Sequence, residues 1–130
     1  MTDPVQIALV GVLILLFKHL VFDFVLQAPY QYQNKGIYGH PGGILHAGLH
    51  ALGTTPVFLW IAPSLRLALA IMVGEFIVHY HVDWTKEQIV KRMNLTSENA
   101  AFWWTLGVDQ FLHDATYVAI VALLMAGRGG

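Results

Sequence analysis

The sequence predicts an all-α integral membrane protein: a four-transmembrane-helix up-down bundle whose third helix extends beyond the membrane. Of its 130 residues, 56% are hydrophobic and only 12% are charged, whereas a soluble domain usually has about a quarter charged residues. Four apolar segments are also long enough to cross a bilayer, for which about 18 to 20 residues suffice. Only helices and closed barrels span lipid, and four short segments cannot close a barrel, so the spans are expected to be helices.

The first predicted span covers residues 5–27, and the second, which is short and rich in small residues, covers residues 44–61. The first span has no basic region before it and no small-residue cleavage site after it, so it is expected to be retained in the protein rather than removed as a signal peptide. The stretch between the spans, at 28–43, is rich in glycine, proline and tyrosine, which predicts an interfacial loop with Pro41 at the start of the second helix.

The third predicted span covers residues 65–85, and its helix is expected to continue past the membrane as an amphipathic extension. Ser64 precedes this helix and is its predicted N-cap. The fourth span covers residues 100–125, with Thr96 or Ser97 as the expected cap. No repeat interrupts this order, so residues 1–130 are expected to form a single membrane domain.

Lysine and arginine residues predict the orientation. Those that flank the two longer loops, after the first and third spans, are Lys35, Lys86, Lys91 and Arg92. The opposite side has only Arg66 and Arg128. Positive residues concentrate on the cytoplasmic side of membrane proteins. The chain is therefore expected in the bacterial inner membrane, as a multi-pass protein with both termini outside the cytoplasm.

Composition also restricts the chemistry. The chain has no cysteine, which excludes disulfides, thiolate metal sites and a catalytic thiol. Its net charge is −1, and without a basic surface it is not expected to bind nucleic acid. The expected partner is the lipid bilayer, and the oligomeric state is left open. Any metal site would be built from nitrogen and oxygen ligands.

Every predicted span carries a polar stripe, because its polar residues are about four apart and so share one face of a helix. The stripe contains His19, Asp23 and Gln27, then His46 and His50, then Glu75, His79, Asp83 and Lys86, and finally Asp109 and His113. In an up-down bundle all four parts lie at the same depth, toward the two longer loops. Ionisable side chains at that depth are costly unless paired and usually have a function. The alternative is that they only form hydrogen bonds between helices.

Imidazoles and carboxylates on facing helices are how helical bundles bind metals. The stripe therefore predicts a site for one divalent metal ion or two, with zinc or manganese first and iron as an alternative. The expected ligands are His19, Asp23, His46, His50, His79, Asp109 and His113. Glu75 and Asp83 are the candidates for a general base. His81 and Lys18 point about 120° and 100° away from the stripe, so both are expected to lie outside it.

These segments resemble a family of small bacterial and phage membrane proteins that is known only as a domain of unknown function. The resemblance is carried by HLVFDFVLQ (19–27), Lys35, HAGLH (46–50), EFIVHYHVDWTK (75–86) and DQFLH (109–113). It covers nearly the whole chain and adds Gln27, Lys35 and Gln110 to the expected site. It implies no reaction.

The favoured hypothesis is a metal-dependent hydrolase embedded in the membrane. Lys35, Lys86 and the glycine-rich start of the second helix would hold an anionic or phosphate-bearing substrate, together with Gln27 and Gln110. Three alternatives stay open: a transporter for metal ions or protons, a haem or di-iron redox protein, and a structural subunit of a membrane complex. The half of each span away from the stripe offers little polarity, which disfavours a path across the membrane.

Overall fold

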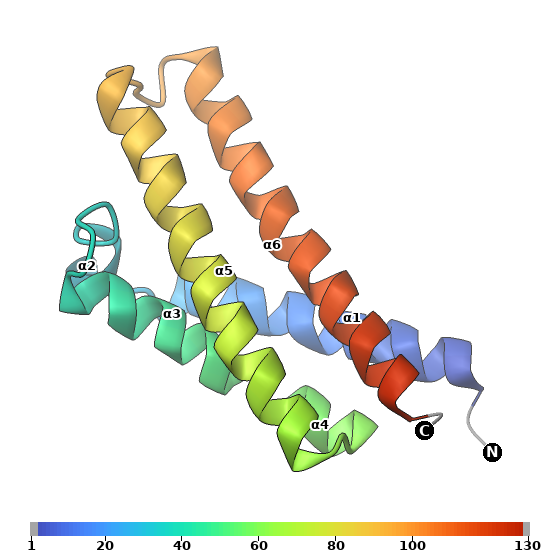
Figure 1. Ribbon diagram of the computed structural model, residues 1–130. Helices are drawn as coiled ribbons and strands as arrows, with labels where there is room; N and C mark the ends of the chain where they lie inside the picture. Colours follow the sequence, from blue (N-terminus) through green and yellow to red (C-terminus); the bar gives the residue numbers. More distant parts are fainter. Residues whose placement is uncertain (1–2, 129–130) are drawn as a thin grey trace.

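The computed structural model describes residues 3–128 and is helical, with no strand among those residues (Figure 1). Its elements are α1 (Pro4–Leu20), the π-helical turn η1 (Val21–Val25), α2 (Pro29–Tyr32), α3 (Pro41–Gly53), α4 (Thr55–Ile61), α5 (Leu65–Arg92) and α6 (Ala100–Gly127). Within the described part, four helical stretches are long and apolar enough to cross a membrane: Pro4–Val25, Pro41–Ile61, Leu65–Arg92 and Ala100–Gly127. The predicted fold class is confirmed.

The long helices alternate in direction, and the start of α1 and the end of α6 lie on the same side of the molecule (Figure 1). Helices α5 and α6 form an antiparallel hairpin that crosses α1 and α3. Helix α3 packs mainly against α5, and α1 packs against α4 and α6. The four long stretches therefore enclose one shared interior.

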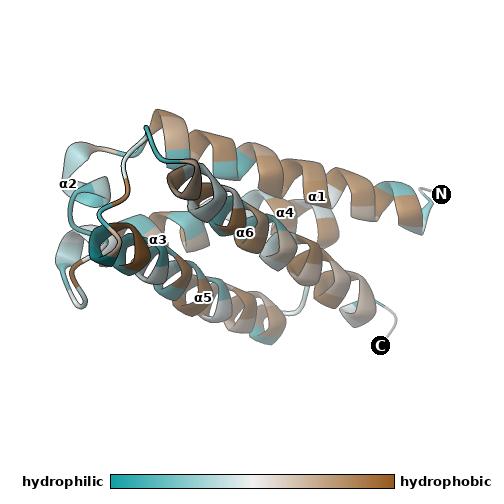
Figure 2. Ribbon diagram, turned by 90° about the horizontal axis from the view of Figure 1, so that it is seen from above, coloured by the Kyte–Doolittle hydropathy of each residue, from teal (hydrophilic) through white to brown (hydrophobic). Residues whose placement is uncertain are grey.

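The long helices are rich in hydrophobic residues, which are brown in the ribbon of Figure 2. On α1, Leu9, Leu13 and Phe17 form one exposed stripe, each about two-thirds accessible (64%, 65% and 65%). Soluble monomers rarely expose contiguous apolar surface of this extent. The stripe is suited to contact with lipid chains.

The interior has two halves of different character. Toward the chain ends it is a dry apolar core, formed by Ile7, Leu15, Val57, Ile61, Ile71, Ile120, Val121 and Leu124, with Tyr117 at its border. Toward the two longer loops it is filled with polar side chains. The polar half holds the candidate site.

The first span is predicted to be one helix over residues 5–27, but it does not stay α-helical over that whole length. It changes at Val21 into a π-helical turn, in which the amide of Leu26 donates to the carbonyl of Val21 over 2.8 Å. Single π-turns inside α-helices are frequent at functional sites. This turn contains Asp23, one of the expected site residues.

The second span begins at Pro41, as predicted, but is two helices rather than the single helix expected over residues 44–61. The reason is Pro56, which has no amide hydrogen to donate to the carbonyl of Leu52. The hydroxyl of Thr55 donates to that carbonyl instead, over 2.6 Å. The break between α3 and α4 is thus stabilised locally.

One of the two predicted helix caps is confirmed. Ser64 caps α5, since its hydroxyl accepts from the amide of Leu67 over 3.3 Å. The prediction of Thr96 or Ser97 as the cap of the fourth helix is wrong, because α6 begins after Asn99. The Asn99 side chain accepts from the amide of Thr96 and so closes the preceding turn.

Candidate metal centre

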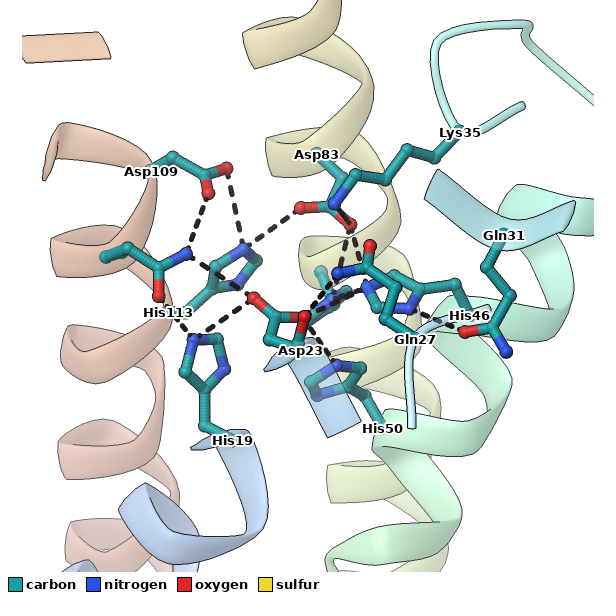
Figure 3. A network of polar contacts seen from close by, with 12 residues as sticks. His19, Asp23, Gln27, Gln31, Lys35, His46, His50, Asp83, Asp109 and His113 are labelled. Carbon is teal, nitrogen blue, oxygen red and sulfur yellow. Dashed lines mark hydrogen bonds and ion pairs between the residues drawn. The ribbon is translucent and has the colours of Figure 1, made fainter. Parts of the chain in front are cut away.

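The polar half of the bundle contains a compact cluster of buried histidines and aspartates (Figure 3). Its members are His19 on α1, Asp23 on η1, His46 and His50 on α3, His79 and Asp83 on α5, and Asp109 and His113 on α6. None of them is more than 6% exposed. The structure therefore brings together expected residues from all four spans, because their four-residue spacing turns each pair toward the shared interior.

Within residues 3–128, two groups have ligand atoms close enough to hold a metal ion, and the larger consists of Asp23, His46, His50 and His79. Asp23 Oδ1 lies 2.9 Å from His50 Nε2 and 3.1 Å from His46 Nε2. His46 Nε2 lies 3.2 Å from His79 Nε2. Ligands around a tetrahedral zinc ion with ordinary bond lengths are about 3.3 Å apart. The spacing fits one ion with three imidazoles and one carboxylate.

The second group consists of His79, Asp83 and His113. Asp83 Oδ1 lies 3.2 Å from His113 Nε2, and its Oδ2 lies 3.4 Å from His79 Nε2. Asp83 Oδ2 is also only 3.2 Å from His46 Nε2, in the first group. Both groups include His79, whose Nε2 has one lone pair and so binds one ion only. The groups therefore describe alternative positions for one ion, or two ions of which one binds His79.

Several buried polar atoms of the cluster have no hydrogen-bond partner among the described residues: Gln27 Oε1, His50 Nδ1, His79 Nδ1, Asp83 Oδ2 and Asp109 Oδ1. Buried polar groups are nearly always paired, and each unpaired one costs about 1–3 kcal/mol. Asp83 Oδ2 lies within 3.2–3.4 Å of nitrogens of His46, His79 and Lys35, yet no hydrogen bond has the required geometry. A bound cation would satisfy Asp83 Oδ2, which these nitrogens surround without a hydrogen bond.

Gln31 orients one of these imidazoles. Its Oε1 is 3.1 Å from His46 Nδ1, and an amide oxygen only accepts, so Nδ1 carries the hydrogen and Nε2 offers its lone pair to the first group. Sequence analysis missed Gln31, because α2 lies in the segment predicted as a loop. A signal was available, since Gln27, Gln31 and Lys35 continue the four-residue spacing of the first stripe.

His19 belongs to neither ligand group. Its Nδ1 is 2.9 Å from Tyr117 Oη, and its Nε2 is 2.8 Å from Gln110 Oε1 and 3.3 Å from Asp23 Oδ2. Since the amide and carboxylate oxygens accept, Nε2 donates and Nδ1 accepts from the tyrosine hydroxyl. In this arrangement His19 orients Asp23, and the ligand role expected from sequence stays a prediction that the geometry does not favour. Asp109 likewise lies in neither group.

Glu75 lies below the cluster, where it forms an ion pair with Lys18 and accepts from the Thr54 hydroxyl. Lys18 also donates to the His50 carbonyl over 3.1 Å. The expectation that Lys18 lies outside the stripe is wrong, because its side chain is buried in the bundle, contacts Tyr117 Oη at 3.4 Å beside His19 and neutralises the carboxylate of Glu75. Both Glu75 oxygens are occupied, so the general-base role predicted for Glu75 has no support from its contacts.

Lys35 extends from the loop after α2 into the cluster, where its Nζ lies 3.3 Å from Asp83 Oδ2. Burial lowers the pKa of Lys35, but the carboxylates of Asp83, Asp23 and Asp109 raise it, and the net change is upward. These carboxylates therefore favour the charged form of Lys35 beside the candidate ligands. His81, by contrast, is exposed and contacts Tyr38 Oη at 3.0 Å, away from the cluster as predicted.

A polar cavity of about 320 Å³ opens beside the cluster on the side of the longer loops. It is lined by the four residues expected to bind substrate, Gln27, Lys35, Lys86 and Gln110, and by Asp23 and Asp109. Lys86 Nζ is paired with Glu87 Oε1 at 2.5 Å. The structure therefore gathers the predicted substrate-binding residues around one space next to the candidate ligands.

Comparison with known proteins gives one match. A family model described as "Protein of unknown function (DUF3307)" matches residues 12–128, which include every residue of the cluster. No curated protein and no solved structure matches the chain. The argument for a function therefore depends on the geometry of the site.

Proposed function

The chain belongs to the DUF3307 family, whose function is unknown, and from the geometry of its buried site we propose that it is a membrane-embedded hydrolase that uses a divalent metal ion. The main support is the group formed by Asp23, His46, His50 and His79, whose ligand atoms lie 2.9–3.2 Å from their neighbours inside a bundle of apolar helices. Such a set suits zinc or manganese, with iron as an alternative.

The bound ion would lower the pKa of a water molecule and so supply a nucleophile at neutral pH. Asp83 is the best-placed general base, because its Oδ2 lies beside the first group and lacks a hydrogen-bond partner. Lys35, 3.3 Å from that oxygen, would keep Asp83 ionised and ready to accept a proton. Its positive charge would also stabilise negative charge that develops on the substrate.

The substrate would carry an anionic group, such as a phosphate. Lys35 and Lys86 line the cavity beside the cluster, and the amides of Gln27 and Gln110 line it as well. Two cations and two amides at one wall suit an oxygen-rich anion. The metal and the lysines together would balance the aspartates of the site.

Most of the lysine and arginine residues lie on the side of the cavity, with Lys35 in the loop after α2 and Lys86, Lys91 and Arg92 at the end of α5. By the positive-inside rule we propose that the site opens to the cytoplasmic face of a bacterial inner membrane, with both termini on the other side. A transporter would need a polar path to both faces. The apolar core between the cluster and the chain ends, with Leu15, Ile71 and Leu124 at its centre, favours an enzyme over a transporter.

The test is the metal content of the purified protein, measured by inductively coupled plasma mass spectrometry. We expect one or two equivalents of zinc or manganese per chain, lost in the double variant H46A/H50A. The matched control is H81A, because His81 is an exposed histidine outside both groups, and it should keep the metal. A metal-free, folded protein that takes up neither zinc nor manganese on titration would contradict the proposal.

Turnover is tested separately with a panel of phosphomonoesters and phosphodiesters. The variant D83N should keep at least half of the metal but lose about 10²–10⁴-fold in turnover, as expected when a general base is removed. If D83N hydrolyses the best substrate at the wild-type rate, Asp83 is not the base.

A further inference from the structure

Helices α5 and α6 leave an apolar groove of about 490 Å³ between them. Its walls include Val82 and Ile89 from α5 and Trp104, Val108 and Leu112 from α6. Trp104 is 71% and Val108 is 59% exposed, so the groove opens to the outside of the bundle, where lipid surrounds a membrane protein. Its shape and composition suit a hydrocarbon chain.

The groove is not isolated from the candidate site. Two of its lining residues, Lys86 and Asp109, also line the polar cavity beside the cluster. The apolar groove and the polar cavity therefore meet at these two side chains. A ligand that filled both would have a hydrocarbon part and a polar head joined at that point.

The cavity specifies what the head would carry. Lys35 and Lys86 line it and would complement a phosphate once a bound metal ion offsets the carboxylates of Asp23, Glu87 and Asp109, which also line it. Asp109 Oδ1 and Gln27 Oε1 are buried acceptors without a hydrogen-bond partner among residues 3–128, and His113 Nε2 lies 3.6 Å from Asp109 Oδ1. Such acceptors call for a donor on the ligand, since leaving them unpaired is costly. A phosphate that bears a hydroxyl or ammonium group meets both requirements.

We infer that the substrate is a membrane glycerophospholipid, which enters sideways from the bilayer with its acyl chain in the α5–α6 groove and its head in the polar cavity. This inference rests on the proposed hydrolase function, but binding of the lipid is measurable apart from the metal. Trp104 and the charged residues at the end of α5 are typical of the membrane–water interface, where phospholipid heads join their acyl chains.

The test is native mass spectrometry of the purified protein, with metal content measured on the same sample. The probes are phosphatidylglycerol, diacylglycerol, which lacks the phosphate, and glycerol 3-phosphate, which lacks the chains. We expect the wild type to bind phosphatidylglycerol at least tenfold more tightly than either of the others. Variant V108W fills the groove and should weaken this binding at least tenfold without changing metal content. Val118 is 56% exposed on the same helix outside the groove, so V118W is the matched control.

A second variant, K86M, should weaken binding of phosphatidylglycerol but not of diacylglycerol. It tests the inference independently if V108W fails to fold. Equal binding by V108W and V118W would overturn the inference, and so would glycerol 3-phosphate bound as tightly as the lipid. Normal metal content with no selective lipid binding contradicts the lipid substrate alone. Groove-dependent lipid binding by a protein that takes up no metal supports the lipid site and contradicts the hydrolase.

Discussion

The contact between Gln31 and His46 provides a sharp test of the metal centre. Gln31 is 6% and His46 is 1% exposed, and 3.1 Å separates Oε1 from Nδ1. In the variant Q31L the Nδ1 hydrogen would have no acceptor in a buried site, which costs about 1–3 kcal/mol. Imidazole orientation would also be lost, and removing such a partner usually weakens metal affinity 10- to 100-fold. That range equals about 1.4–2.8 kcal/mol, in agreement with the first figure.

The assay is a competition titration of the purified protein with a chromophoric zinc chelator. Gln33 is exposed two residues further along the chain, so Q33L is the matched control and should bind zinc like the wild type. If Q31L is folded and binds zinc within twofold of the wild type, Gln31 does not orient a metal ligand. The tautomer assigned to His46 would then be incorrect, and the contact with Gln31 would have no role in orienting the first group.

Three further predictions follow from other contacts. K18M should lower the free energy of unfolding in mixed micelles by about 3–5 kcal/mol, because it leaves Glu75 buried without its ion pair. The double variant K18M/E75L should recover most of that loss. A double variant whose loss equals the sum of the losses of the two single variants would contradict this. G42A should cost about 1–3 kcal/mol, since a Cβ would lie 2.2 Å from the Tyr30 carbonyl, whereas Gly48 has open space and G48A should be neutral. Zinc should be released as the pH is lowered, because protons compete with the metal for the imidazoles and carboxylates that bind it; a zinc affinity that does not change with pH would contradict a site built from these ligands.

Much of the fold could be predicted because the signals are local. Apolar length defines the four spans, and proline and serine mark where α3 and α5 begin. The cluster could be anticipated for the same reason: a spacing of four places His46 and His50, or His79 and Asp83, on one face. Alternation of the helices then brings these faces to one depth.

The remaining features depend on contacts between distant residues. Gln31 joins the cluster only because α2 folds back against α3, which the loop-like composition does not indicate. The angle of about 100° between Lys18 and His19 predicts Lys18 outside the stripe. The sequence does not show that its partner Glu75, on another helix, lies beside it. The spacing of His19 predicts a metal ligand, but Tyr117 and Gln110, both on α6, contact its two ring nitrogens. Such pairings leave no periodic trace in the sequence.

The ion pair of Lys18 and Glu75 also explains why the polar site stops where it does. The break at Pro56 exposes carbonyls of α3, and Lys18 satisfies the His50 carbonyl while Thr54 donates to both that carbonyl and Glu75. These contacts neutralise the charges locally, so nothing polar has to continue into the apolar core beyond. A site closed on that side and open toward the groove and the cavity has one direction of access. That geometry agrees with the proposed hydrolase acting on a lipid of the surrounding bilayer, whereas a transporter would need access from both faces.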